Sequence, residues 1–113
     1  MNTVQEIIGA VCTPNTVESF RRELIKQAET HDDFARMTRD DRARKSAIYQ
    51  KNACLSIYDD AYYGAVGDIC ADLSKCVIAL NVACKLLGIS PATRTAAIVH
   101  WQETQVANGI WRD

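Results

Sequence analysis

One stretch of this sequence constrains the fold more than any other. The run from Asp68 to Gly88 reads DICADLSKCVIALNVACKLLG. Its apolar residues recur at alternating spacings of four and three, which is the period of one face of an α-helix. This face comprises Ile69, Leu73, Cys76, Leu80, Ala83 and Leu87. The run therefore predicts a helix and favours an all-α fold.

The same helix is apolar on more than one side. At about 100° per residue, Ile78 and Val82 fall on the far side of the helix from the first stripe. A helix that is apolar nearly all round is usually buried. Two interpretations are open: the chain's own helices cover this second face, or the face pairs with a second copy or with another protein.

Length and composition fit a single small domain. The chain has 113 residues, of which 48% are hydrophobic and 24% charged, with a formal net charge of −1. This apolar content is too high for a disordered chain, and the charge is too low for a generally basic nucleic-acid binder. We expect one helical domain over residues 1–113, a compact bundle of four to five helices around a central helix at about 66–87.

Two helices are predicted near the start of the chain. Thr3 and Glu6 have the spacing of a capping box, which opens a short first helix. Asn15 is the predicted cap of a second helix, whose apolar stripe includes Phe20 and Leu24. This second helix should end near the polar segment 30–33, which predicts a turn or a new helix start.

A third helix is predicted to begin after the cap residue Thr38 and to end at about Tyr58. The segment that follows is ambiguous, because Gly64 and Gly67 weaken a helix without forbidding it. We favour one long helix through this segment to Leu87. The alternative is a new helix that begins at residue 68.

The end of the central helix and the start of the last one are better defined. Gly88 is a strong stop signal, since glycine adopts the left-handed conformation easily. Ser90 and Pro91 then provide an N-cap and a first helical residue. The last helix is predicted to end at Asn108-Gly109.

The five cysteines predict no disulfide framework. Their number is odd and no CxxC pair is present, so buried reduced thiols are expected. They are Cys12, Cys54, Cys70, Cys76 and Cys84. No apolar run is long enough to cross a bilayer and the N-terminus has no basic leader region, so we expect a cytoplasmic protein.

Asp68 and Asp72 are the basis of an enzymatic alternative. The run 66–73, the apolar helix, and the later 87–89 and 99–100 resemble the second half of MazG-type nucleotide pyrophosphohydrolases, over about a third of the chain. The resemblance implies an all-α, oligomeric enzyme that cleaves nucleoside triphosphates to monophosphates with Mg²⁺. Asp68 and Asp72 would then bind the metal.

That resemblance also requires a second acidic cluster, from another helix. The nearest group in this sequence lies within residues 29–33. Its members are Glu29, Asp32 and Asp33.

A second alternative is DNA binding through residues 83–101. The run ACKLLGISPAT resembles the turn of a helix-turn-helix motif, which reads DNA with its second helix. That helix would present residues 91–95 to the major groove. Only one of them, Arg94, is a cation.

The function that we predict first is a protein–protein contact without a cofactor. Tyr and Trp are enriched in protein interfaces. The residues expected to form the interface are Tyr58, Tyr62, Tyr63, Ile78, Val82, Trp101 and Trp111. We expect a homodimer with a regulatory or inhibitory role, of the kind that phages and other mobile elements encode.

Overall fold

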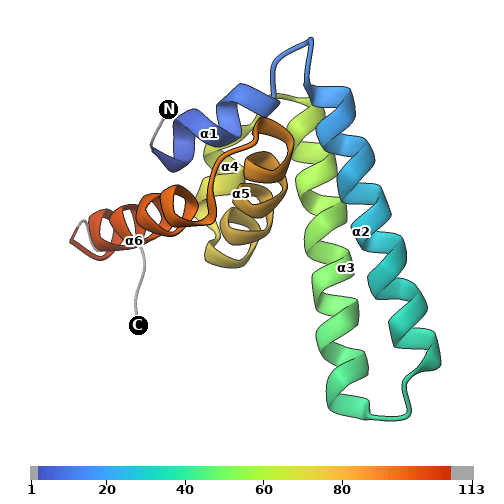
Figure 1. Cartoon of the computed structure of the whole chain (residues 1–113). Helices are drawn as coiled ribbons and strands as arrows, with labels where there is room; N and C mark the ends of the chain where they lie inside the picture. Colours follow the sequence, from blue (N-terminus) through green and yellow to red (C-terminus); the bar gives the residue numbers. More distant parts are fainter. Residues whose placement is uncertain (1–2, 108–113) are drawn as a thin grey trace.

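The computed structural model describes residues 3–107, and within this range the chain folds into six α-helices and no β-strand. The helices are α1 (Val4–Val11), α2 (Val17–Met37), α3 (Asp41–Tyr62), α4 (Val66–Ala71), α5 (Leu73–Leu87) and α6 (Pro91–Ala107) (Figure 1). The predicted all-α class is confirmed. None of these described helices is both long and apolar enough to span a membrane.

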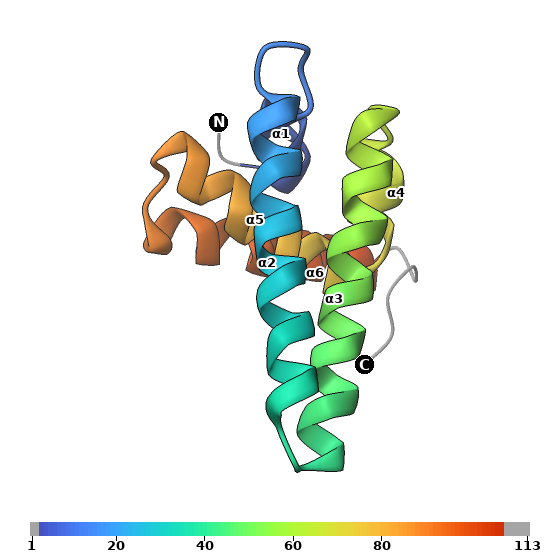
Figure 2. The ribbon, with the colours of Figure 1, turned by 90° about the vertical axis from the view of Figure 1, so that its right-hand side faces the viewer.

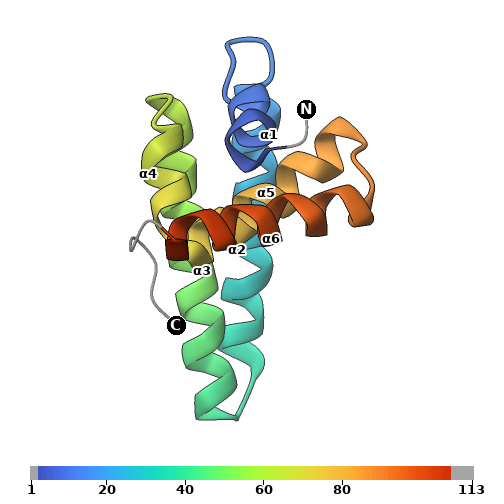
Figure 3. The ribbon, with the colours of Figure 1, turned by 90° about the vertical axis from the view of Figure 1, so that its left-hand side faces the viewer.

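The helices form two layers. Helices α2 and α3 make a long antiparallel hairpin, and α1, α4, α5 and α6 pack together against one side of its upper part (Figure 1). Seen from the hairpin side, α2 and α3 lie in front and α5 and α6 cross behind them (Figure 2). Seen from the opposite side, α6 lies in front, with α5 between it and the hairpin (Figure 3). One broad side of the hairpin is therefore not covered by any other described helix.

The hydrophobic core lies between the hairpin and α5 and continues between α5, α4 and α1. Each Leu, Ile or Phe that it buries contributes about 1.5–3 kcal/mol to folding. Its largest fully buried side chains are Val4, Ile7, Ile8, Val11, Phe20, Leu24, Ile57, Ile69, Leu80 and Val82. The α1 residues among them explain why so short a helix is held in place, since its whole apolar face is buried.

The lower part of the hairpin is held together differently. Its buried residues are small ones that lie outside the main core cluster: Ala28, Ala35, Ala47, Ala53 and Cys54. Small side chains let the two helices approach closely. They pack only in the contact between α2 and α3 and do not join the main core cluster. This distal part therefore projects from the domain as a two-helix arm (Figure 1).

The central helix predicted over 66–87 is in fact two helices. Asp72 has an extended backbone (φ −106°, ψ 123°), and its carboxylate accepts a hydrogen bond from the Lys75 backbone N–H at 3.0 Å. The chain thus ends α4 and caps α5 at Asp72. A second break lies before α4, at Gly64, which has φ +67°. The preferred prediction of one long helix is wrong, because Asp72 acts as a helix cap and not as a helix-interior residue.

The predicted burial of this region is confirmed for most of its apolar residues, but Leu73 and Leu86 are exposed. Helix α5 packs against each of the other five helices of the described range, so the chain covers its own central helix. Val82 is 1% exposed and Ile78 packs against the core. Cys54, Cys70, Cys76 and Cys84 are buried, Cys12 is half-buried, and all five are free thiols as predicted.

Several predicted caps are confirmed and two are wrong. Thr3 accepts a hydrogen bond from the Glu6 N–H, and Ser90 accepts one from the Thr93 N–H. Helix α3 is capped by Asp40, two residues after Thr38, because the Asp40 carboxylate accepts from two backbone N–H groups. Helix α2 begins after Thr16, one residue beyond the predicted cap Asn15. The predicted end at Asn108-Gly109 lies outside the described residues.

Candidate interaction surface

A groove lies along the seam between α2 and α3 of the hairpin. Two adjoining hollows of about 320 Å³ and 180 Å³ form it, and they share Ile25. Only α2 and α3 contribute to its walls, whose residues are Glu18, Arg21, Arg22, Ile25, Ala28, Glu29, Asp32, Lys51, Leu55 and Tyr58. We refer to this set as the hairpin groove.

The floor of the hairpin groove is apolar at its centre. Ile25, Leu55 and Tyr58 are half-buried, and they come from both helices. Charged residues flank them on either side. An apolar strip with charged margins between two helices is the surface to which a further amphipathic helix packs.

An arginine–tyrosine cluster closes the upper end of the groove. The guanidinium carbon of Arg21 lies 3.7 Å from the ring centroid of Tyr58 and 4.8 Å from that of Tyr62. The Nε of Arg21 also donates a hydrogen bond to the Tyr58 carbonyl oxygen at 3.1 Å. The cluster ties α2 to α3 and fixes the orientation of the guanidinium.

Two of the tyrosines predicted for an interface remain accessible beside this cluster. Tyr62 is 64% exposed and Tyr63 is 80% exposed. Their rings contact edge to face, with centroids 4.9 Å apart. Exposed, mutually packed aromatic rings are typical of contact surfaces.

An ion-pair network joins the two helices at the lower end of the groove. Asp32 pairs with Lys51 of α3 at 2.9 Å and with Arg36 of its own helix at 2.9 Å. The hydrogen bond from Lys51 holds the pKa of the Asp32 carboxyl below its ordinary value. Asp32 is therefore a structural carboxylate that helps to hold the arm together.

The acidic residues of the enzymatic alternative are not brought together. Asp68 is exposed in the first turn of α4 and Asp72 caps α5, whereas Glu29 and Asp32 lie on α2. Within residues 3–107, no group of three or more His, Cys, Asp or Glu side chains is arranged to hold a metal ion. The four carboxylates thus do not form the two-helix magnesium site that the resemblance implies.

The remaining predicted interface residues take different roles. Val82 is wrong as a partner contact, since the chain's own core encloses it, and Ile78 also packs inward. The indole Nε1 of Trp101 donates to the Cys70 carbonyl oxygen at 3.4 Å, which links α6 to α4. Trp111 lies outside the described residues.

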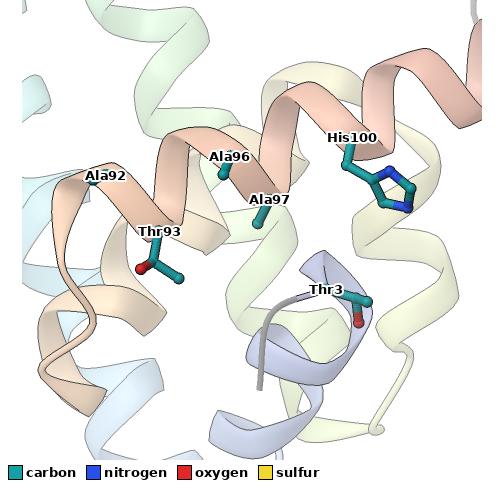
Figure 4. A pocket seen from close by; sticks show the side chains of 6 residues that line it. All are labelled: Thr3, Ala92, Thr93, Ala96, Ala97 and His100. Atoms are coloured by element: carbon teal, nitrogen blue, oxygen red, sulfur yellow. The ribbon is translucent and has the colours of Figure 1, made fainter.

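A larger hollow of about 570 Å³ lies between the start of α1 and one side of α6 (Figure 4). Figure 4 shows Ala92, Ala96 and His100 along α6, with Thr3 across from them. His100 is the only titratable side chain in its lining, and the Thr3 hydroxyl already donates to Glu6.

The same helix α6 was the predicted reading helix of the DNA-binding alternative. Its single cation, Arg94, is half-buried. A DNA-reading surface needs several cations for the phosphates. The exposed residues of α6 add no further Lys or Arg, and they include the acidic Glu103.

Exposed apolar side chains also gather on the distal arm. Phe34, Met37, Ile48 and Tyr49 are all exposed, and Met37 reaches 81%. These four residues do not line the hairpin groove, which is the candidate site.

Comparison of the chain with family models, with curated proteins and with solved structures finds no match. The fold and the surface define the class by themselves: a small all-α domain that presents a grooved helical hairpin.

Proposed function

We propose that this protein acts by protein–protein contact, and that the hairpin groove is its docking surface. The observation that carries the proposal is the apolar strip of Ile25, Leu55 and Tyr58 in a groove that only α2 and α3 line. Two packed helices are half of a four-helix bundle, and a second pair of helices completes it.

The dimensions of the hairpin suit this form of packing. Helices α2 and α3 contain 21 and 22 residues. At a rise of about 1.5 Å per residue, each is about 30 Å long. A surface of this length and two helices wide is of the order of the ~800 Å² per partner that stable interfaces bury. A homodimer is the simplest assembly that buries it, since closed two-fold dimers are the commonest oligomers.

Light scattering over a range of protein concentrations tests this function. The wild-type chain is expected to have the mass of a dimer. Ile25→Asp and Leu55→Asp should shift it to a monomer, because each places an unpaired carboxylate in the centre of an apolar contact. Val99→Asp, at an exposed position on α6, is the matched control and should remain a dimer.

Circular dichroism and thermal unfolding of each variant show that the comparison is made between folded chains. A wild-type chain that stays monomeric at its highest soluble concentration would contradict the homodimer. A dimer that survives both groove substitutions would place the contact elsewhere on the molecule.

A further inference from the structure

The charges of the hairpin groove are paired within the chain, with two exceptions. Glu18 pairs with Arg22, and Asp32 pairs with Arg36 and Lys51. Arg21 and Glu29, which both line the groove, have no ion-pair partner among the described residues. The groove therefore presents one cation and one carboxylate that remain open to another molecule.

Arg21 and Glu29 are each four residues away from Ile25 in the sequence of α2. Arg21, Ile25 and Glu29 are spaced by four residues along α2, which places them on one stripe of the helix. The cation precedes Ile25 and the carboxylate follows it. Such a stripe is complementary to itself when it is turned end for end about Ile25.

Two-fold symmetry determines which residues of the two copies face each other. In a two-fold interface, residue i of one subunit contacts residue j of the other, and j contacts i in return. With the axis at Ile25, Arg21 of each copy comes opposite Glu29 of the other. We propose that a second copy of this chain binds antiparallel on the hairpin groove, with Ile25 at the two-fold axis and two reciprocal Arg21–Glu29 ion pairs.

Arg21 is already prepared for this contact. Its Nε is occupied by the Tyr58 carbonyl oxygen, and the rings of Tyr58 and Tyr62 hold its guanidinium in place. The two Nη amines remain as donors, and a guanidinium pairs with a carboxylate through two parallel hydrogen bonds. Because the side chain is held in advance, less conformational entropy is lost on binding.

The same arrangement brings the apolar residues into register. Ile25 of the two copies meets at the axis, and Leu55 and Tyr58 of each copy lie beside it. Residue 17 of one α2 comes opposite residue 33 of the other, so the helices overlap over about 24 Å. The apolar centre supplies the affinity and the ion pairs select the antiparallel register.

This inference rests on the proposed function, and a charge exchange tests it separately. Arg21→Glu alone and Glu29→Arg alone each place like charges opposite one another at both pairs. Each variant by itself is expected to dimerise at least about tenfold more weakly than the wild type. An equimolar mixture of the two variants should form a heterodimer, because both reciprocal pairs are then satisfied. Native mass spectrometry or analytical ultracentrifugation distinguishes the species.

Two further chains complete the test. The double variant Arg21→Glu/Glu29→Arg restores both pairs within one sequence and should form a homodimer again. Glu29 is exposed, so Glu29→Arg keeps the fold and gives a result even if Arg21→Glu is poorly folded. Arg39→Glu, at an exposed position outside the hairpin groove, is the control for net charge and should not create a preference for the Glu29→Arg chain.

The possible outcomes separate the two proposals. If Ile25→Asp abolishes the wild-type dimer but the mixed variants and the double variant stay monomeric, the hairpin groove is the interface and this register is wrong. If the wild type never dimerises, the homodimer itself fails, and this pairing fails with it.

Discussion

The guanidinium of Arg21 lies 3.7 Å from the Tyr58 ring centroid, and its Nε donates to the carbonyl oxygen of the same residue at 3.1 Å. The two residues are 37 positions apart in the chain. One side chain of α2 thus binds both the ring and the backbone of α3. This contact determines the relative position of the two helices at the base of the arm.

Replacement of Arg21 by alanine is therefore expected to destabilise the fold. The substitution removes a cation–π contact, worth about 0.5–1 kcal/mol at an exposed site, and one hydrogen bond, worth about 0.5–1.5 kcal/mol. We expect the free energy of unfolding to fall by about 1–2 kcal/mol in urea titration. Arg22→Ala is the matched control, since Arg22 makes only an exposed pair with Glu18 at 3.4 Å and should change stability by less than about 0.5 kcal/mol. Equal effects of the two substitutions would contradict the role assigned to the cluster.

The two phenylalanines of α2 offer a second comparison on one helix. Phe20 is fully buried in the main core, whereas Phe34 is 51% exposed on the distal arm. Phe20→Ala should lower the free energy of unfolding by about 3–5 kcal/mol. Phe34→Ala should cost much less, because half of the ring is already in water. Chemical denaturation of the two variants under conditions where the chain is monomeric measures the difference.

The all-α class and several helix ends were predictable because their signals are local. The apolar period of α5, the capping pair Thr3–Glu6 and the Gly88 stop all act within a few residues. Gly88 has φ +70°, as its position after α5 requires. A reader of the sequence needs no tertiary information to find these features.

The break at Asp72 was missed because the apolar stripe continues in phase across it. Residues 30–33 were interpreted as a turn or a new helix start because they are polar. They lie inside α2, on a projecting arm where most of the helix surface is in water and polar residues carry no turn signal. The first error comes from apolar periodicity, which does not reveal a cap, and the second from interpreting polarity without knowledge of exposure.

The candidate site was predictable only in part. Tyr58 and Tyr62 were selected as contact residues for their type, and both belong to the cluster at the groove. Arg21 was not, since its importance depends on the register in which α2 pairs with α3. No local signal in the sequence specifies that register.

The stability of the fold should depend on pH through Glu23. Lys85 of α5 binds its carboxylate at 3.0 Å, and this hydrogen bond holds the pKa of Glu23 below the ordinary value of 4.5. A carboxyl whose pKa is lower in the folded chain stabilises the fold above its unfolded pKa and loses this contribution as the pH falls through its folded pKa. The stability difference between wild type and Glu23→Gln should therefore be constant near neutral pH and diminish below about pH 4.5.

Lys85→Met provides the complementary measurement. Without the lysine, the pKa of Glu23 should return towards its ordinary value, and the wild-type chain should lose more stability on acidification than this variant. Denaturant titrations at several pH values give both curves. An unchanged pH profile in Lys85→Met would show that the pair between α2 and α5 does not contribute.

Asp72 distinguishes a helix cap from a metal ligand. Its carboxylate accepts the Lys75 backbone N–H at 3.0 Å and begins α5, the helix that every other described helix contacts. Asp72→Ala should therefore lower the free energy of unfolding by about 1 kcal/mol. Asp72→Asn should retain most of the stability that the cap contributes, because asparagine is also a good N-cap. Asp68→Ala, at an exposed position in α4, is the control and should change stability by less than about 0.5 kcal/mol.

If the two carboxylates held Mg²⁺ instead, the metal would raise the melting temperature of the wild type, and either alanine substitution would remove that increase. We expect the same melting temperature with and without Mg²⁺, because the capping role of Asp72 needs no ion.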